Sequence, residues 1–424
     1  MSATSQRPLA MSLASSVFHP PAFDHRVRDL LGAFPPGIFT EKLHFSIELI
    51  HRYTLELAVE LLRSLGVTAH MRSWRKADEL CRVLSFDSKF GPTLSWLIDA
   101  AVELGEIEVR QGESLRYHRA ADSRPRDLTT LRDSVLAIDA ANAATLDLLD
   151  YAASIYPAVA RGEASAEQVL FEPQKIALWL AFFRNDNPSY AVNNWIGAFA
   201  AIDRVASHSR FSILEIGAGA GSGAEILLQV LNARGLAGRL ERYVVTEPST
   251  FFLRRAQRNL TRRYPDLPLE FRALDINTAW AAQSASEGSF DLVYGINVMH
   301  IAHDLAYSLR QARDSLATNG WLVMGECVHT NRYKPIFPEF IFQTLESFRS
   351  VQTDPALRPA PGFLTPYYWR RALAHAGFHV QQVEPDVERI SELCPNFLSS
   401  AVCGQKKGTG FEGSTTDTRW SGYE

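Results

Sequence analysis

Cysteine is scarce in this chain of 424 residues. The four cysteines lie far apart, at Cys81, Cys327, Cys394 and Cys403, and no two of them have the Cys-x-x-Cys spacing of a zinc or redox site. The histidines are isolated too, so we expect no metal. Scattered cysteines of this kind are typical of a reducing compartment, and we expect a cytoplasmic protein.

Long apolar runs and an excess of one charge are also missing. The longest apolar stretches, such as Ala177–Phe183, are far too short to span a bilayer, and the N-terminus has no apolar segment typical of a signal peptide. The 43 Lys and Arg and the 47 Asp and Glu are mixed throughout. We therefore expect no membrane and no nucleic acid as partners. The length allows two or three domains, each with its own core.

Glycine is concentrated where chemistry is expected. The stretch Phe211–Glu225 reads FSILEIGAGAGSGAE, an apolar run that reaches Glu215 and then breaks into glycines. A strand followed by a glycine turn and a helix brings the backbone close to a nucleotide-like ligand. The spacing lacks the Gly-x-Gly-x-x-Gly of NAD proteins and the Gly-Lys-Ser/Thr ending of a P-loop. The glycines are Gly217, Gly219, Gly221 and Gly223.

From Ser207 onward, apolar runs alternate regularly with helical stretches. Seven runs with helices between them predict a doubly wound α/β sheet. The runs are 212–216, 242–245, 269–274, 290–296, 321–324, 379–383 and 397–402.

Acidic residues follow the second and third of these strands. Glu247 ends the second run (YVVTEPS), where a carboxylate can accept both hydrogen bonds of a ribose diol. Asp275 follows the third run (RALDIN), and the fourth reads FDLVYGINVMH. The carboxyl ends of parallel strands meet at one sheet edge, so these groups are predicted to share a site.

With these motifs the region resembles the class I S-adenosylmethionine (SAM) methyltransferases, whose fold is a seven-stranded Rossmann-like sheet. The resemblance implies SAM as cofactor, with the glycine turn as motif I and an acid near the adenine amino group. One departure is Ala317–Gly320 (ATNG), where that family usually has a Pro-Gly-Gly turn. The implied cofactor residues here are Glu215, Gly217, Gly219, Gly221, Glu247, Pro248, Asp275, Ile276 and Asn297.

The N-terminal part predicts helices over 41–65, 75–83 and 94–104 and a hairpin over 105–118, which is a winged-helix-like order. Between Arg26 and Arg124 there are fourteen Lys and Arg and fourteen Asp and Glu, a net charge of zero. A DNA reader needs a positive face. We therefore favour a dimerisation or lid module over DNA binding, and a homodimer is one expected assembly.

Composition divides the chain into five parts. Residues 156–195 are too aromatic for a flexible linker and are expected to cover the cofactor site. The parts are a disordered lead (1–25), the winged-helix-like module (26–124), a helical lid or linker (125–205), the SAM-binding methyltransferase domain (206–404) and a disordered tail (405–424).

The expected catalytic pair is His300 and Glu326. His300 follows the fourth strand, and an imidazole there can remove a proton from carbon or oxygen. Glu326 ends the neighbouring fifth strand (WLVMGE), so a hydrogen bond between the two can fix the histidine tautomer and stabilise the imidazolium. His303 and His329 compete for the role of base, and a helix-capping role is the alternative for His300.

The segment NVMHIAHDLAYSLRQARDSLATNGWLVMGE is similar to the C-methyltransferase domains of polyketide synthases, as are RGEASAEQVLFEP and RNDNPSYAVNNW. The resemblance covers roughly residues 125–404. It implies that His300 deprotonates the α-carbon of a β-ketoacyl thioester, that Glu326 orients it, that Asn297 holds the substrate carbonyl, and that Tyr190 and Asn194 border the SAM pocket.

The chain departs from those domains in two ways. The Gly-Trp-Trp often found between the fifth and sixth strands is missing from the aromatic-rich region 331–368. The chain also shows no synthase or carrier region, so we expect a free-standing enzyme whose acyl substrate is a small molecule or arrives on a carrier protein.

Two other functions stay open. A small-molecule O-methyltransferase also combines a winged helix with a histidine base after the fourth strand, although its second acid normally lies further along than Glu326. A SAM-binding regulator without catalysis is the alternative from a different class. Failure to bind DNA would exclude it.

Overall fold

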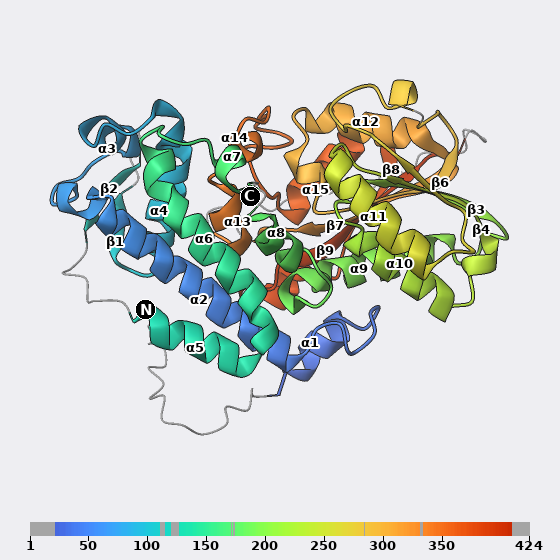
Figure 1. The fold of residues 1–424 in the computed structure, drawn as a ribbon, viewed down its shortest axis with the longest axis horizontal. Helices are drawn as coiled ribbons and strands as arrows, with labels where there is room; N and C mark the ends of the chain where they lie inside the picture. The colour runs from blue at the N-terminus through green and yellow to red at the C-terminus, as the bar shows by residue number, and fades with distance from the viewer. Residues whose placement is uncertain are drawn as a thin grey trace, which may run out of the picture.

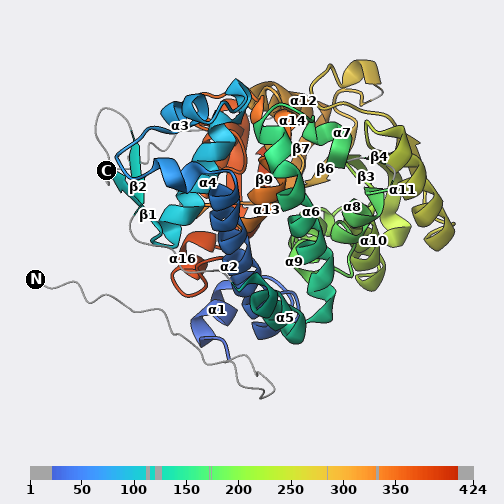
Figure 2. The same cartoon turned by 60° about the vertical axis from the view of Figure 1, so that its left-hand side comes forward.

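The structure, a computed structural model, describes residues 22–110, 115–119, 127–170, 172, 174–283, 285–330 and 334–408. Most of the expected disordered lead and tail lies outside these ranges. The helical N-terminal half packs beside an α/β half built around one large sheet (Figures 1 and 2). Among the described residues no helix is both long and apolar enough to cross a bilayer.

The sheet has seven strands in the order β5-β4-β3-β6-β7-β9-β8. The first five in this order are parallel, whereas β9 runs antiparallel to both β7 and β8. This confirms the α/β fold predicted from the apolar runs. The strands are β3 (Phe211–Ile216), β4 (Leu240–Thr246), β5 (Leu269–Arg272), β6 (Phe290–Ile296), β7 (Leu316–Cys327), β8 (Phe378–Glu384) and β9 (Ser399–Lys406).

The order in which the chain adds strands to the sheet changes direction at β3. From β3 it extends outward through β4 to β5 and then returns to place β6 on the other side of β3. Such a reversal leaves a crevice outside the carboxyl ends of the two central strands, which is where open α/β sheets bind ligands. All six residues of β3 are buried, as expected of a central parallel strand.

Helices cover both faces of the sheet. In Figure 1, α9 and α10 lie below it and α12 and α15 above it. Helix α9 packs on β6, β7 and β9, and α15 packs on β8. The helices of this half are α9 (Pro188–Val205), α10 (Ser222–Ala233), α11 (Thr250–Arg263), α12 (Leu305–Ser315), α13 (Phe337–Phe342), α14 (Glu346–Arg349), α15 (Pro366–His375) and α16 (Val387–Ser391).

The N-terminal half is helical apart from one hairpin. Strands β1 and β2 pair antiparallel with Ile107 opposite Arg119, as the alternating pattern predicts. The long helix α2 packs against α4, α5 and α6. The elements are α1 (His25–Leu30), α2 (Glu41–Ser64), α3 (Ala77–Val83), α4 (Gly91–Glu103), β1 (Ile107–Arg110), β2 (Arg116–Arg119), α5 (Leu128–Ile138), α6 (Ala143–Ala160), α7 (Ala166–Leu170) and α8 (Ile176–Phe182).

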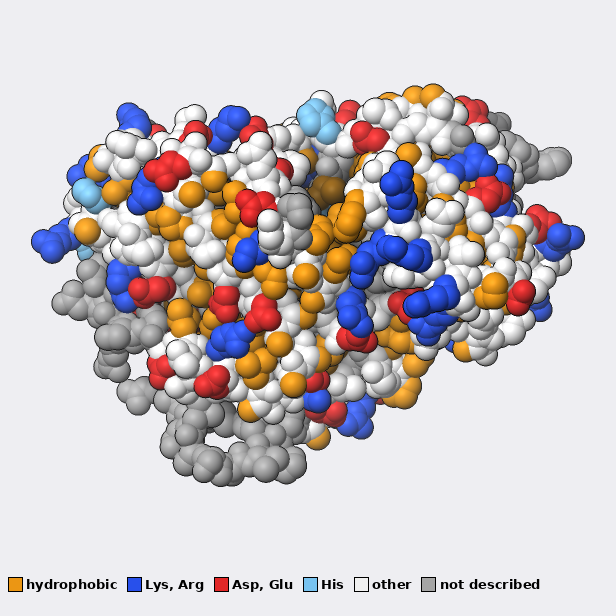
Figure 3. All heavy atoms as spheres, in the orientation of Figure 1, with side chains coloured by type: hydrophobic (Ala, Val, Ile, Leu, Met, Phe, Trp, Pro, Cys, Tyr) orange, Lys and Arg blue, Asp and Glu red, His pale blue; other side chains and the backbone are white. Residues whose placement is uncertain are grey.

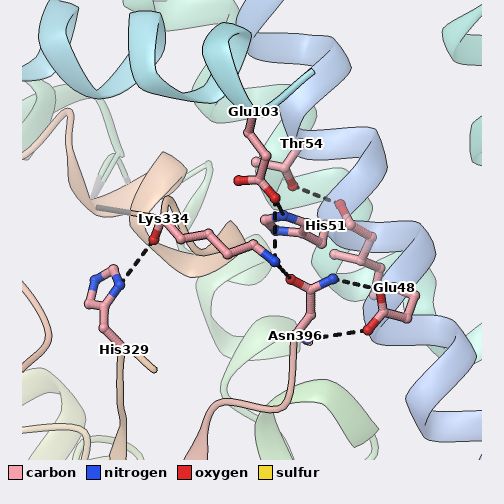
Figure 4. A network of polar contacts seen from close by, with 8 residues as sticks. Glu48, His51, Thr54, Glu103, His329, Lys334 and Asn396 are labelled. Atoms are coloured by element: carbon pink, nitrogen blue, oxygen red, sulfur yellow. Dashed lines mark hydrogen bonds and ion pairs between the residues drawn. The ribbon is translucent and has the colours of Figure 1, made fainter. Parts of the chain in front are cut away.

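Polar contacts join the two halves. Figure 4 shows Lys334 between Glu103 of α4 and Asn396, which in turn bonds to Glu48 of α2. On the adjoining segment, the Trp96 indole N–H donates to Glu339 Oε2 at 2.8 Å. The helical half therefore contacts the segment between β7 and β8, the insertion that carries the aromatic residues.

Candidate active site

The turn after β3 leaves open space at the crevice. Gly217 and Gly219 have φ of +59° and +54°, values that L residues rarely adopt. A side chain at Gly217 would collide with Val298, whereas one at Gly219 would meet no atom within 4 Å. Because α10 begins at Ser222, directly after this turn, its first N–H groups face the same space.

Glu247 lies at the rim of this space, one residue past β4. Its Oε2 accepts from the Gly219 N–H and its Oε1 from the Ser249 N–H, both at 3.0 Å. Burial raises the pKa of Glu247 above the ordinary glutamate value, although both N–H groups act in the opposite direction. The two fixed oxygens suit a ribose diol, as the sequence predicts.

Glu215 is buried within β3. Its Oε2 accepts from the Tyr243 hydroxyl at 2.9 Å, and burial raises its pKa to about 8. Its side chain does not line the cavity described below.

Four further residues expected to bind the cofactor do not line that cavity either. Asp275 lies three residues beyond β5, where its Oδ1 accepts from the Asn277 N–H at 2.9 Å and closes the loop. The others are Gly221, Pro248 and Ile276.

On helix α9 the asparagine that lines the cavity is Asn193, whereas the sequence predicts Asn194. Asn194 is fully buried and donates to Asn185 at 2.7 Å, away from the cavity. Its neighbour Asn193 lines the cavity, together with Tyr190. The Asn193 Oδ1 is buried and has no hydrogen-bond partner among the described residues, so it can accept a hydrogen bond from a ligand.

The structure brings His300 and Glu326 together. His300 lies in a short 3₁₀ turn after β6, and its Nδ1 is 2.7 Å from Glu326 Oε2. Glu326 is completely buried, and its other oxygen accepts from the N–H groups of Val298 (3.2 Å) and Met299 (2.9 Å). These bonds fix the carboxylate, which holds the histidine by Nδ1 and leaves Nε2 as the free ring nitrogen.

Asn297, at the carboxyl end of β6, lines the cavity beside His300. Its φ is +49°, and its Oδ1 accepts from the Cys327 N–H at 2.8 Å. With Oδ1 engaged, the amide nitrogen is the polar group that Asn297 can offer to a ligand.

The other histidines are placed differently. His303 is exposed, and His329 bonds through Nε2 to Glu339 Oε1 at 2.9 Å. Neither lines the cavity beside the glycine turn.

The insertion adds aromatic residues and one arginine to the site, and of these only the arginine was missed in the sequence. The Phe363 ring centroid lies 4.2 Å from that of His300, and Phe348 meets the same ring from the side at 6.0 Å. The buried Arg358 donates to the carbonyl oxygens of His300 (3.2 Å) and Ala302 (2.8 Å). All three belong to the insertion between β7 and β8, where the number of aromatic residues was the only signal.

These groups surround a cavity of about 300 Å³. One side is formed by the glycine turn, Glu247, Asn297 and His300, and the other by aromatic residues of α8 and of the insertion, including Trp179 and Phe348. Figure 3 shows the surface hollowed between the two halves of the molecule. The open space at Gly219, the fixed Glu247 carboxylate and the unpaired Asn193 oxygen fit an adenosylated ligand.

Comparison with known proteins agrees with this geometry. Residues 214–322 match the model of a methyltransferase domain. The chain is 34% identical over 215 residues to a highly reducing polyketide synthase of Pyrenophora dematioidea, and 27% identical over 274 residues to polyketide synthase PksR of Bacillus subtilis (strain 168). These stretches cover 50% and 63% of this chain but only 8% and 10% of those proteins, so the chain spans a small part of their length.

Solved structures extend the similarity to most of the chain. The CurJ carbon methyltransferase aligns with a TM-score of 0.72 and 22% identity, covering 90% of this chain and 99% of that one. The DszA carbon methyltransferase aligns with 0.69 and 24%, covering 91% and 94%. The CMeT domain of the citrinin polyketide synthase aligns with 0.67 and 15%, covering 91% and 95%. The methyltransferase-domain match confirms the enzyme class predicted from the sequence, a SAM-dependent methyltransferase, and the chain has the fold of the CurJ and DszA carbon methyltransferases and of the citrinin polyketide synthase CMeT domain.

Proposed function

We propose that the protein methylates the α-carbon of a β-ketoacyl thioester or similar polyketide-like substrate in secondary metabolism, with His300 as the base. The observation that carries the proposal is the His300–Glu326 pair, in which His300 lines the same cavity as the glycine turn. The carbon methyltransferases of similar fold and the polyketide synthases of similar sequence support carbon as the acceptor.

His300 removes the α-proton at Nε2, because Nδ1 is held by Glu326. The imidazolium that forms is stabilised by a buried carboxylate, whose second oxygen stays fixed by two backbone N–H groups. SAM, when bound at the glycine turn, supplies an electrophilic methyl group.

Asn297 and the aromatic wall complete the site. The Asn297 amide nitrogen donates to the carbonyl oxygen on which negative charge develops as the proton leaves. The rings of Trp179, Phe348 and Phe363 exclude water from the carbanion and hold the acyl group in place. The acyl group arrives as a thioester on a small carrier molecule or on a carrier protein.

The test is a mass-resolved methylation assay with SAM and a short β-ketoacyl thioester, beside a panel of phenols and hydroxy acids. We expect one methyl group on the α-carbon. Methylation of a hydroxyl group would instead establish the O-methyltransferase alternative, and SAM binding without turnover of any acceptor would favour the regulator.

The base is tested by His300→Ala, with the exposed His303→Ala as the matched control. We expect His300→Ala to lose roughly 10²- to 10⁴-fold in kcat, the usual contribution of a general base, while calorimetry shows unchanged SAM affinity. Equal turnover of the two variants would exclude His300 as the base.

A further inference from the structure

Helix α11, which borders the active-site cavity, carries charge of one sign only. Its 14 residues include five arginines and no acidic residue, whereas the whole chain has a net charge of −4. Arg254 and Arg258 are exposed and Arg255 is half-buried, and none of the three forms an ion pair with another described residue. Arg254 and Arg258 are four residues apart, so their like charges repel each other on one side of the helix. A partner of opposite charge would remove this repulsion.

These arginines lie next to the mouth of the active-site cavity. Phe252 of the same helix lines that cavity, and its ring centroid is 5.2 Å from that of Phe251, which is 51% exposed. Figure 3 shows Lys and Arg side chains gathered beside the hollow between the two halves, in the region where Figure 1 places α11. A partner bound to this side of α11 is therefore beside the opening of the cavity that His300 lines.

The residue types on this side of α11 favour a protein as the partner. Arginine and aromatic residues are enriched in protein interfaces, and Phe251 adds an exposed apolar ring to the three cations. A nucleic acid needs cations along a longer run of phosphates, and the protein as a whole is negatively charged. Complementary charge then selects a partner with an acidic surface.

We propose that Phe251, Arg254, Arg255 and Arg258, here called the α11 face, bind a carrier protein with an acidic surface that presents the acyl thioester to the cavity. The proposal rests on the proposed function and chooses a carrier protein over a small carrier molecule. Attraction between opposite charges speeds the encounter of two proteins and leaves the chemical step unchanged. The effect of the α11 face therefore belongs to kcat/KM.

The experiment compares an acetoacetyl group on three carriers: an acyl carrier protein of net negative charge, coenzyme A and N-acetylcysteamine. For the wild-type protein we expect kcat/KM to be roughly tenfold higher or more with the carrier protein than with either small thioester. This advantage should shrink as the salt concentration rises from about 50 to about 500 mM, because salt screens exposed charges.

The test variant is Arg254→Glu/Arg258→Glu, and the matched control is Arg72→Glu/Arg389→Glu, which reverses two exposed arginines on other elements. We expect the test variant to lose roughly tenfold or more in kcat/KM with the carrier protein and to keep the wild-type value with N-acetylcysteamine. The control should keep both values. If the charge reversal disturbs the fold, Arg254→Gln/Arg258→Gln removes the two charges and gives the same comparison.

Four results would overturn the proposal while leaving the proposed function standing. The first is a wild-type kcat/KM of the test variant with the carrier protein, and the second is a wild-type protein that prefers the N-acetylcysteamine thioester. The third is an equal loss with coenzyme A, which would mean that the arginines bind the phosphates of a small carrier. The fourth is binding of duplex DNA that the test variant loses. Failure of the wild-type protein to methylate any of the three thioesters would instead contradict the proposed function.

Discussion

Arg358 is a buried charge that contacts the backbone around His300, the proposed base. Its hydrogen bonds go to backbone carbonyl oxygens, those of Gln352 in the insertion and of His300, Ala302 and His303 in the turn after β6. Burial lowers its pKa to about 10, so the guanidinium stays protonated at neutral pH. One side chain therefore joins the aromatic insertion to the backbone of His300.

We expect Arg358→Met to lower both stability and kcat. Each buried acceptor left unpaired costs roughly 1–3 kcal/mol, so the free energy of unfolding should fall by about 3 kcal/mol or more in urea titrations. Turnover should fall because the His300 backbone loses its anchor, while the KM for SAM stays near the wild-type value. Arg262→Met is the control, since Arg262 is exposed on α11. Wild-type kcat in Arg358→Met would contradict the positioning role.

Glu215 should make stability depend on pH. Its pKa is about 8 in the folded protein against 4.5 as the ordinary value, so between these pH values the folded state binds more protons than the unfolded state. Its contribution to stability is present below about pH 4.5 and is lost as the pH rises through 8. We expect melting temperatures from pH 5 to 8 to decline less in Glu215→Gln than in the wild-type protein. Parallel curves would show that Glu215 is ionised throughout.

At the scale of elements, the apolar runs predicted all seven strands but not their arrangement. The apolar run 321–324 is shorter than β7, which begins at Leu316. The polar segment ATNG belongs to the strand as well, with Asn319 at φ +63°. The antiparallel direction of β9 was not predictable from pattern, since it depends on pairing with strands distant in sequence. The hairpin, in contrast, follows from a local pattern.

The contact between His300 and Glu326 was predictable because it follows from strand adjacency. β6 and β7 pair in parallel, so residues at their carboxyl ends meet. The choice between Asn193 and Asn194 was not predictable. Successive side chains on a helix point about 100° apart, and the sequence does not determine which face of α9 lies toward the cavity. Arg358 and Phe363 lie in an insertion without periodicity, and only the folded chain brings them to His300.

Two glycines of the turn after β3, Gly217 and Gly219, should respond differently to replacement by alanine. Gly219→Ala puts a methyl group into open space, so we expect only about 1–2 kcal/mol of backbone strain but at least tenfold weaker SAM binding. Gly217→Ala collides with Val298 and should lower the melting temperature further. Calorimetry and thermal unfolding separate the two effects. Wild-type SAM affinity in Gly219→Ala would show that the open space is not the cofactor's.

At the scale of the whole molecule, the two halves share one core. A single cluster of buried apolar residues runs from Val27 to Cys403. Polar bonds cross between the halves as well, since the Thr93 hydroxyl donates to the Gln343 carbonyl and the Tyr156 hydroxyl to that of Phe340. An interface of this kind predicts that the halves unfold together.

Cooperative unfolding can be tested by hydrogen exchange with the product S-adenosylhomocysteine as ligand. A ligand at 100 times its dissociation constant slows global opening about 100-fold, because it binds only the folded state. We expect the slowest amides of α4, far from the glycine turn in sequence, to be protected by the same factor as those of β6. The short α1 is the control, since a helix of only six residues should exchange by local fraying and stay unaffected. Protection of β6 without protection of α4 would mean that the N-terminal half opens independently of the sheet.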